Sequence, residues 1–259
     1  MKADAGTLLQ AVAEAATLAG ATAMRGWRTR LTVERKDDGS PVTDADRAAE
    51  RAVREWIEQR FPHDGILGEE YGVSRPDAPR RWFIDPIDGT KSFVRGVPLW
   101  GSLVAVVEGE SVLAGAAAYP ATGELLAAAR GEGCFHNGAR AAVSTVTELG
   151  DAIALTTDPS FAAAPALRAR WDAFTGAVAC TRGWGDCYGY LLVATGRAEV
   201  MVDGVFSPWD AAAFQPIVEE AGGVFTDWLG RPTAFGGNGI ATNRALAAPI
   251  RARLIGDLA

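Results

Sequence analysis

The stretch WFIDPIDGTKSF, at residues 82–93, restricts the fold of this chain more than any other. An apolar run leads straight into two aspartates, Asp85 and Asp88, which flank a Pro-Ile pair. The run predicts a buried strand that ends at Asp85. Two carboxylates held about 5 Å apart repel each other by about 3 kcal/mol at an effective dielectric constant near 20. A fold that holds both acids here must offset this repulsion.

The two aspartates favour a site for hard divalent cations. A helix cap would account for one of them but not for both, and Pro86 fixes the backbone between them so that both side chains have defined directions. Mg²⁺ takes carboxylate, carbonyl and phosphate oxygens as ligands. A site for softer metals is not indicated, because the two histidines, His63 and His136, are not at ligand spacing.

The residues after Asp88 favour an anion site. Gly89 lets the backbone approach a ligand closely, and the amides of Gly89 and Thr90, at the start of a predicted helical turn, can hold phosphate oxygens. Carboxylates, two metal ions and an amide cradle are the parts of two-metal phosphoryl transfer.

Further acids stand at the ends of predicted elements. Glu69 and Glu70 follow a short apolar run, Asp210 stands at the start of a predicted helix, and PVTDAD supplies Asp44 and Asp46. Each of these acids taken alone is better explained as a helix cap or as part of a solvated turn.

Composition excludes several classes of partner. The 259 residues are 48% hydrophobic, which is enough for a proper core, and the net charge of −7 argues against nucleic-acid and anionic-membrane surfaces. No stretch reaches 18 apolar residues, and the three cysteines lack a C-x-x-C pair, so we expect free thiols in a cytoplasmic protein without a membrane segment.

Periodicity divides the chain near residue 143 into an α+β half (1–143) and a smaller α/β half (144–259). The segment 34–46 is a predicted loop or hairpin, and Asn-Gly within 135–140 predicts a type I′ hairpin. Predicted helices lie within 4–30, 44–60, 165–176, 186–196, 210–221 and 244–256, and predicted strands at 81–85, 102–108, 112–119, 124–130, 152–157, 198–203 and 239–242.

Four stretches resemble one known family. GEE at 68–70, DPIDGT at 85–90 and WDAAAFQPIVEEAGG at 209–223 are similar to the signatures of the inositol monophosphatase-like, metal-dependent phosphatases, and KDDGSPVTDAD at 36–46 is similar to their N-terminal stretch. The resemblance implies a layered α-β-α-β-α sandwich, a small phosphate monoester as substrate, two or three Mg²⁺ ions per active site and a homodimer.

The resemblance also implies a ligand set. It places Glu69, Asp85 and the backbone carbonyl of Ile87 on one metal ion. It places Asp85, Asp88 and Asp210 on the second, so that Asp85 bridges the two.

The same resemblance implies catalytic roles. Thr90 and Asp46 would position and deprotonate the attacking water, and the amides of Gly89 and Thr90 would hold the phosphate. Glu69 is also counted among the catalytic residues. Glu70 would either contact the metal ligands without binding an ion itself or bind a third ion.

Two stretches are similar to the histidinol-phosphate phosphatases within this family: SFVRGVPLWGSL at 92–103, which has Ser92 where Asn is commoner, and TRGWGDCYGY at 181–190. Histidinol carries an ammonium group and an imidazole. Asp186 or Asp203 is therefore expected to pair with the cation, and Tyr188 or Trp184 to stack on the ring. A helix cap at Asp186 and core positions for the two aromatic residues are the alternatives. The remaining substrate-binding candidates are Asp88, Gly89, Thr90, Lys91, Arg182 and Asp210.

Three other functions compete with this hypothesis. Cys134 and Arg140 fit the C-x₅-R spacing of thiolate phosphatases, although the intervening Asn-Gly favours a hairpin. The acids would also suit a binding module with a structural Ca²⁺. A third alternative keeps the chemistry but takes inositol 1-phosphate or another small phosphate monoester as substrate.

Overall fold

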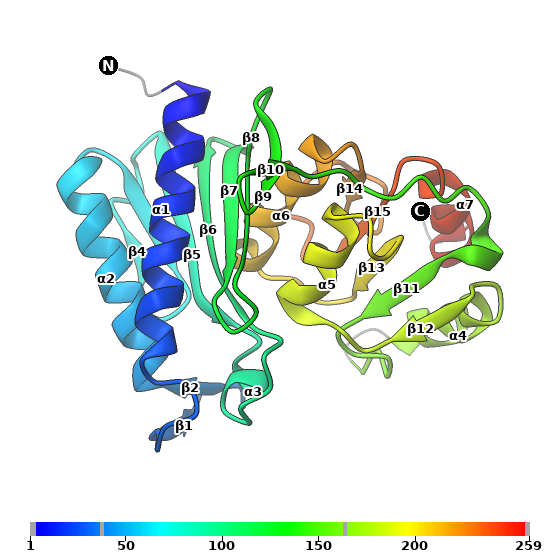
Figure 1. Ribbon diagram of the computed structural model, residues 1–259, viewed down its shortest axis with the longest axis horizontal. Helices are drawn as coiled ribbons and strands as arrows, with labels where there is room; N and C mark the ends of the chain where they lie inside the picture. Colours follow the sequence, from blue (N-terminus) through cyan, green and yellow to red (C-terminus); the bar gives the residue numbers. More distant parts are fainter. Residues whose placement is uncertain (1–3, 37–38, 163–164, 257–259) are drawn as a thin grey trace.

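The computed structural model describes residues 4–36, 39–162 and 165–256, and Figure 1 shows two β-sheets with helices between them and on both outer sides. This arrangement confirms the predicted α-β-α-β-α sandwich. The helices are, in chain order, α1 (Ala5–Met24), α2 (Asp44–Arg60), the short α3 (Thr90–Phe93), the 3₁₀ helix η1 (Leu149–Asp151), α4 (Pro165–Thr175), α5 (Asp186–Ala194), α6 (Pro208–Glu220) and α7 (Ala247–Leu254).

The larger sheet has eight strands in the order β10-β9-β8-β7-β6-β5-β3-β4, and all neighbours are antiparallel except β3 and β5. Its strands are β3 (Gly65–Gly68), β4 (Gly72–Ser74), β5 (Arg80–Asp88), β6 (Gly101–Glu108), β7 (Ser111–Tyr119), β8 (Glu124–Ala129), β9 (Gly133–His136) and β10 (Ala139–Arg140).

Both faces of this sheet are buried, which explains its nearly continuous apolar strands. Side chains alternate between the faces. Trp82 and Val104 pack with α1 and α2, whereas Phe83 and Leu103 pack with α5 and α6 in the core between the sheets.

The smaller sheet has five strands in the order β12-β11-β13-β15-β14. It is mixed: β11 is parallel to β12 and β13, and the remaining pairs are antiparallel. Helices α4 and α7 cover its outer face (Figure 1). Its strands are β11 (Ile153–Thr156), β12 (Cys180–Arg182), β13 (Val200–Asp203), β14 (Val224–Thr226) and β15 (Gly239–Thr242).

Several local predictions are confirmed. Helix α2 spans Asp44–Arg60 with Thr43 as its N-cap and Asp46 closing the capping box. Asn137 and Gly138 have φ values of 48° and 81°, as a type I′ hairpin requires. Segment 34–46 is a hairpin formed by β1 (Val33–Arg35) and β2 (Pro41–Thr43).

Some predicted boundaries were wrong, and two short strands were missed. Strand β5 continues past Asp85 to Asp88, and its register with β6 shifts between these residues. Such a bulge lets a strand accommodate a proline. Helix α1 ends at Met24, and α6 begins at Pro208. The three-residue strands β12 and β14 were not predicted, because they are too short to show a two-residue period.

The two sheets meet around α6, which packs against β6 and β7 of the larger sheet and against β14 of the smaller. The predicted boundary at residue 143 falls in the connection between β10 and β11. The division into two domains stays a prediction. Within the ranges given above, no helix has the length and apolar character that crossing a membrane requires.

Candidate active site

Two neighbouring carboxylates of β5 and a third that is distant in the sequence converge at one place in the structure. Asp85, Asp88 and Asp210 each offer an oxygen within 4.8 Å of the others. Strand β5 supplies the first two, and the first turn of α6 supplies the third. The structure therefore brings these three predicted ligands together.

The bulge in β5 fixes the directions of Asp85 and Asp88. Oδ1 of Asp85 accepts a hydrogen bond of 2.9 Å from the amide of Ile87, and the hydroxyl of Ser102 donates to the carbonyl of Pro86 at 2.6 Å. Because Asp85 is only 2% exposed, water does not compete for these bonds. The Asp-Pro-Ile-Asp segment is therefore held from both sides.

Backbone amides outside β5 hold the other two acids. The amide of Cys187, at the start of α5, donates to Oδ2 of Asp88. The amide of Ser207 donates to Oδ2 of Asp210 at 3.2 Å and closes a capping box at the start of α6. No local pattern in the sequence identified Cys187 as a partner of Asp88.

Burial and mutual repulsion raise the pKa values of all three acids. Removal from water is the largest cause for each. The charge of Glu69 adds to the effect on Asp85 and Asp210, and the charge of Asp186 adds to it on Asp88. The pKa of Asp210 is about 7. Buried, crowded oxygens that resist ionisation without a counter-charge fit a hard divalent cation.

Glu69 lies at the edge of this cluster and already has a cationic partner. The ammonium of Lys36 is 2.6 Å from Oε1 of Glu69 and 2.7 Å from Oε1 of Glu70. Burial lowers the pKa of Lys36, but hydrogen bonds to both carboxylates outweigh that effect, so its pKa is raised overall. Burial raises the pKa of Glu70 to about 7. Sequence reasoning missed Lys36, although it opens the stretch KDDGSPVTDAD.

Glu50 of α2 holds the turn that carries Glu69 and Glu70 by hydrogen bonds to its main chain. Sequence reasoning missed this residue too. Its fully buried carboxylate accepts hydrogen bonds from the amide of Glu70 at 2.7 Å and the amide of Tyr71 at 3.2 Å. The guanidinium of Arg54 balances its charge at 2.7 Å. The sequence did offer a signal for Glu50, because it is an acidic residue on the inward face of a predicted helix.

Thr90 and Asp46 meet beside the metal-ligand candidates. The hydroxyl of Thr90 donates to the carbonyl of Ile87 at 2.9 Å and lies 3.5 Å from Oδ1 of Asp46. Oδ2 of Asp46 accepts from both the amide and the hydroxyl of Thr43, at 2.8 and 2.6 Å. Burial raises the pKa of Asp46 to about 6, against these hydrogen bonds. The carbonyl of Ile87 and the carboxylate of Asp46 therefore both lie within hydrogen-bonding distance of the Thr90 hydroxyl.

Gly89 occupies a position that a larger residue would not fit. Its φ of 84° is in the left-handed region, and a Cβ there would lie 2.9 Å from the carbonyl oxygen of Leu99 and 3.4 Å from Oδ2 of Asp186. It caps α3, whose first main-chain bonds run from Ser92 and Phe93 back to Gly89. The amides of Gly89 and Thr90 come before the first of these bonds, so they take no part in the hydrogen bonding within α3.

Two of the substrate candidates, Asp186 and Asp203, differ in their surroundings. Asp186 begins α5 and lies beside Gly89, and burial raises its pKa while the ammonium of Lys91 lowers it. Asp203 is 5% exposed and already accepts from Thr157 and Tyr190. The amide of Thr157 donates to Oδ1 of Asp203 and the hydroxyl of Tyr190 donates to Oδ2, so each carboxylate oxygen already accepts one hydrogen bond.

The aromatic and basic candidates of 181–190 lie further out. Trp184 is 41% exposed, which rules out the alternative that it belongs to the core. Tyr188 is partly buried and meets the ring of Tyr119 edge-on. Arg182 is exposed, donates to the carbonyl of Thr181 and lies over the ring of Trp184. The structure places no contact between Arg182 and the acids among the described residues.

The thiolate alternative is contradicted. Cys134 is fully buried in β9, and burial raises its pKa to about 12. A thiol with such a pKa is not a nucleophile at neutral pH.

Comparison with known proteins agrees with this geometry. The model of the inositol monophosphatase family matches residues 4–257. A histidinol-phosphatase of Chlorobaculum parvum is 46% identical over 85% of each chain, and one of Mycobacterium tuberculosis is 42% identical over 86% of this chain and 88% of its own. The solved structure of an inositol monophosphatase from Zymomonas mobilis superposes with a TM-score of 0.86 at 33% identity, covering 98% of this chain and 99% of that one.

Proposed function

Because the chain belongs to the inositol monophosphatase family and is a phosphatase, we propose that it is a Mg²⁺-dependent histidinol-phosphatase, which converts L-histidinol phosphate and water to L-histidinol and phosphate in histidine biosynthesis. The names of the two relatives above support this substrate, as do the stretches at 92–103 and 181–190. The observation that carries the reaction type is the convergence of Asp85, Asp88 and Asp210.

The proposed metal site takes two or three Mg²⁺ ions. Glu69, Asp85 and the carbonyl of Ile87 would hold one ion, and Asp85, Asp88 and Asp210 a second; Glu70 would stand behind them or hold a third. When bound, the ions supply positive charge that polarises the phosphoryl group and makes water a better nucleophile.

The chain's own residues would position the attacking water and the phosphate. The Thr90 hydroxyl, which contacts both the carbonyl of Ile87 and the carboxylate of Asp46, would orient a water molecule and pass its proton to Asp46. The pKa of Asp46, about 6, suits a base that works near neutral pH. The amides of Gly89 and Thr90 would hold the phosphate oxygens.

Asp186 is the proposed partner of the substrate ammonium. Its carboxylate lies beside Gly89, next to the proposed phosphate site, and is not fully buried. Asp203 would instead fix Thr157, whose hydroxyl accepts from the amide of Asp186 at 2.8 Å. The ring of Tyr188 or Trp184 would stack on the imidazole, and the ammonium of Lys91 would offset the negative charge of the phosphate.

A direct comparison of substrates tests this proposal. With Mg²⁺ present, we expect kcat/KM for L-histidinol phosphate to exceed that for inositol 1-phosphate by at least about 100-fold, since a charged hydrogen bond contributes about 1.5–3 kcal/mol. A ratio that favours inositol 1-phosphate would support the second candidate function, inositol monophosphatase, which the Zymomonas mobilis likeness favours. No turnover of either ester would refute both.

We also propose a cytoplasmic homodimer. The three cysteines, Cys134, Cys180 and Cys187, are free thiols, which suits a reducing compartment. The dimer rests on the family resemblance. Light scattering after size-exclusion chromatography would return twice the chain mass of 27.2 kDa if the proposal holds, and the chain mass itself if it fails.

A further inference from the structure

The carboxyl ends of three neighbouring strands bring Thr157, Asp186 and Asp203 to one edge of the smaller sheet. Thr157 directly follows β11, Asp203 ends β13, and Asp186 begins α5, the helix that follows β12. Strand β11 lies between the other two and is parallel to both, so the three carboxyl ends share one edge. Ligands of α/β sheets usually bind outside such an edge. Asp186 has a proposed role there, and Thr157 has none so far.

The backbone of Asp186 has an unusual conformation. Its φ is 49°, in the left-handed region that a residue with a Cβ adopts only at a cost in energy. Among the described residues, none donates a hydrogen bond to the Asp186 carboxylate, so this side chain does not cap α5. The surroundings of the main chain must therefore hold the conformation.

The hydroxyl of Thr157 provides that hold. Oγ1 of Thr157 accepts a hydrogen bond of 2.8 Å from the amide of Asp186. The two segments touch, because a Cβ on Gly185 would lie only 2.3 Å from Cα of Thr157. The amide of Thr157 donates to Oδ1 of Asp203 at 3.2 Å. An asparagine at 203 would keep an oxygen for this bond, so the place of Thr157 does not depend on the charge of Asp203.

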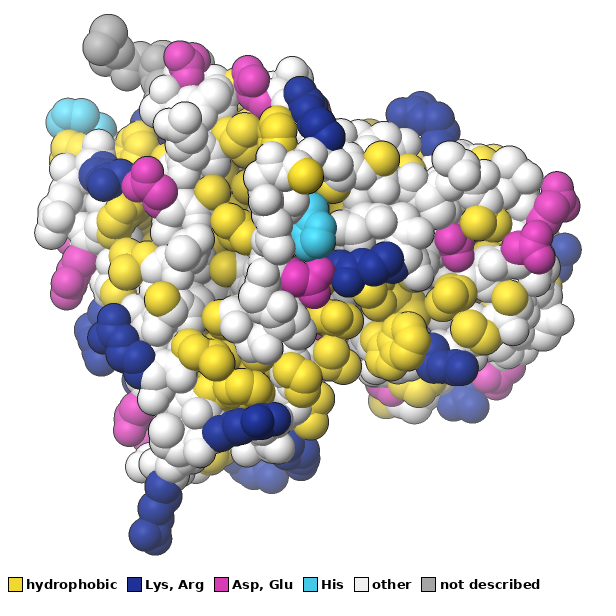
Figure 2. All heavy atoms as spheres, in the orientation of Figure 1, with side chains coloured by type: hydrophobic (Ala, Val, Ile, Leu, Met, Phe, Trp, Pro, Cys, Tyr) yellow, Lys and Arg dark blue, Asp and Glu magenta, His cyan; other side chains and the backbone are white. Residues whose placement is uncertain are grey.

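The next peptide of α5 is held from the opposite side. The amide of Cys187 donates to Oδ2 of Asp88, and the hydroxyl of Tyr119 donates to the carbonyl of Cys187 at 3.0 Å. The rest of α5 packs in the core between the sheets, and Figure 2 shows hydrophobic side chains gathered on the surface where α5 lies between the two halves. Because Cys187 and the rest of α5 are held in place, the bond to Thr157 fixes the backbone of Asp186.

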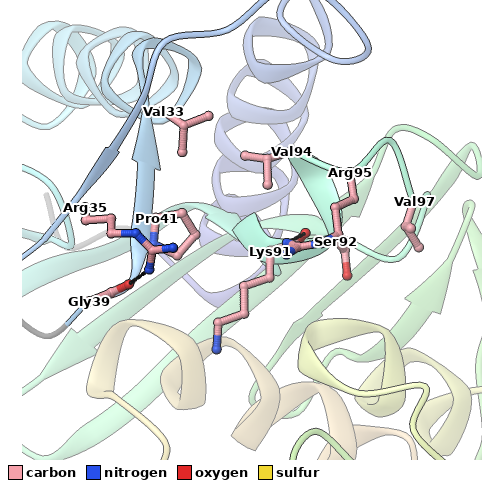
Figure 3. Close-up of a pocket in the computed structure, with 9 residues that line it drawn as sticks. All are labelled: Val33, Arg35, Gly39, Pro41, Lys91, Ser92, Val94, Arg95 and Val97. Atoms are coloured by element: carbon pink, nitrogen blue, oxygen red, sulfur yellow. Dashed lines mark hydrogen bonds between the residues drawn. The ribbon is translucent and has the colours of Figure 1, made fainter.

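The backbone of Asp186 in turn directs its carboxylate toward the proposed phosphate site. Oδ2 of Asp186 lies 3.4 Å from the point that a Cβ of Gly89 would occupy. Figure 3 shows the side chain of Lys91 extending from α3 toward α5 and α6, and its charge lowers the pKa of Asp186 against the effect of burial. The carboxylate thus lies beside the Gly89–Lys91 segment, where a substrate that carries both a phosphate and an ammonium group would bind.

We propose that Thr157 is a positioning residue that sets substrate selectivity: its hydroxyl holds Asp186 in the conformation that directs the carboxylate to the substrate ammonium. The inference rests on the proposed function, in which Asp186 pairs with that ammonium. A carboxylate that is held in its binding direction loses less entropy when the cation binds. Thr157 acts through Asp186 and needs no contact with the substrate, so it should affect the choice between phosphate esters and not hydrolysis itself.

Kinetics of Thr157→Val with two esters test the proposal, because valine keeps the shape of threonine but lacks the hydroxyl. We expect KM for L-histidinol phosphate to rise about 3- to 10-fold, which corresponds to the loss of one neutral hydrogen bond. KM for phenyl phosphate, which has no ammonium group, should not change. Thr157→Ser keeps a hydroxyl and should behave as the wild type does. Thr17→Val, which removes an exposed hydroxyl from α1, is the matched control.

A double-mutant cycle shows whether Thr157 acts through Asp186. In an Asp186→Asn background, Thr157→Val should lose its effect on KM for L-histidinol phosphate, since the charge that Thr157 positions is gone. Thr157 is exposed, so these variants should fold like the wild type, which circular dichroism checks.

Three results would each overturn this proposal alone: an equal rise of KM in both backgrounds, a rise for both esters, or a Thr157→Ser variant as impaired as Thr157→Val. A wild-type chain without a preference for L-histidinol phosphate over phenyl phosphate would instead refute the proposed function, and the selectivity role of Thr157 with it.

Discussion

The carboxylate of Glu50 accepts a hydrogen bond of 2.7 Å from the main-chain amide of Glu70. The bond joins a buried position of α2 to the turn after β3, which carries Glu69 and Glu70. Gly68 permits this approach, because a Cβ there would lie 2.0 Å from Oε1 of Glu50. Glu50 thus sets the position of two predicted metal-site acids without being a candidate ligand itself.

We predict that Glu50→Gln weakens Mg²⁺ binding about 10- to 100-fold, the usual effect of removing a group that orients a metal ligand. The amide side chain keeps one acceptor oxygen, whereas the turn and Arg54 use two. Isothermal titration with Mg²⁺ measures the effect. Glu55→Gln, on the exposed face of the same helix, is the control and should bind Mg²⁺ as the wild type does. Equal affinities in the two variants would remove this role from Glu50.

Asp88→Asn should lower kcat by more than about 100-fold, since changes one step further from a metal already cost up to that much. The same variant should raise the unfolding temperature of the metal-free protein, because the amide removes a buried charge whose pKa is raised by burial and by Asp186 and Asp210. Kinetic assays and calorimetry check the two effects, with the exposed Asp77→Asn as control. Turnover near the wild-type rate would contradict the proposed metal site.

The metal-free protein should lose stability as the pH rises from about 4 to about 7. Asp46 and Asp203 have folded-state pKa values of about 6, and Asp210 about 7, in each case because burial disfavours the charge. Aspartate in an unfolded chain titrates near about 3.9. The unfolded state therefore releases these protons first, and folding becomes less favourable until the folded-state pKa values are passed.

Thermal unfolding between pH 4.5 and pH 8 measures this trend. Saturating Mg²⁺ should reverse it, because the ion binds the ionised carboxylates and stabilises the folded state more strongly as the pH rises. An unfolding temperature of the metal-free protein that rises across this range would show that the acidic cluster does not behave as described.

Gly89→Ala should destabilise the fold and lower kcat/KM at least about 10-fold, because the new Cβ would meet the carbonyl of Leu99 beside the proposed phosphate site. The left-handed backbone alone costs about 1–2 kcal/mol for a residue with a Cβ. Gly109→Ala isolates that cost, since Gly109 has a φ of 63° and open space around it. Denaturant unfolding and kinetics should therefore separate the two variants, and equal kinetic effects would argue against a steric role for Gly89.

Asp186→Asn should raise KM for L-histidinol phosphate about 10- to 100-fold, as expected for the loss of a charged hydrogen bond. The KM for phenyl phosphate, which has no ammonium group, should change much less. Asp203→Asn is the comparison: it disturbs the bonds to Thr157 and Tyr190, so it should lower stability and affect both esters alike. Selective loss of the histidinol ester in Asp203→Asn would transfer the cation-binding role to Asp203.

Local patterns in the sequence were enough for the elements that carry their own signal. The period of α2, its Thr43 cap and the Asn137-Gly138 turn were predictable because each depends on residues a few positions apart. The Asp85-to-Thr90 segment indicated metal and phosphate chemistry for the same reason. The short strands β12 and β14 lack such a signal and form only because the neighbouring strands are in place.

The sequence by itself determined the chemistry that this chain can host: a pair of close acids, an adjoining glycine and hydroxyl, and further acids in a familiar order. Only the tertiary structure decided which acids meet and what each one serves. Packing of both sheets around α6 brings Asp210 to Asp85 and gives Asp88 the amide of Cys187. It also leaves Asp186 partly buried and Asp203 fully buried. The physical reason is that burial and hydrogen-bond partners depend on contacts between distant segments, which short-range periodicity does not record.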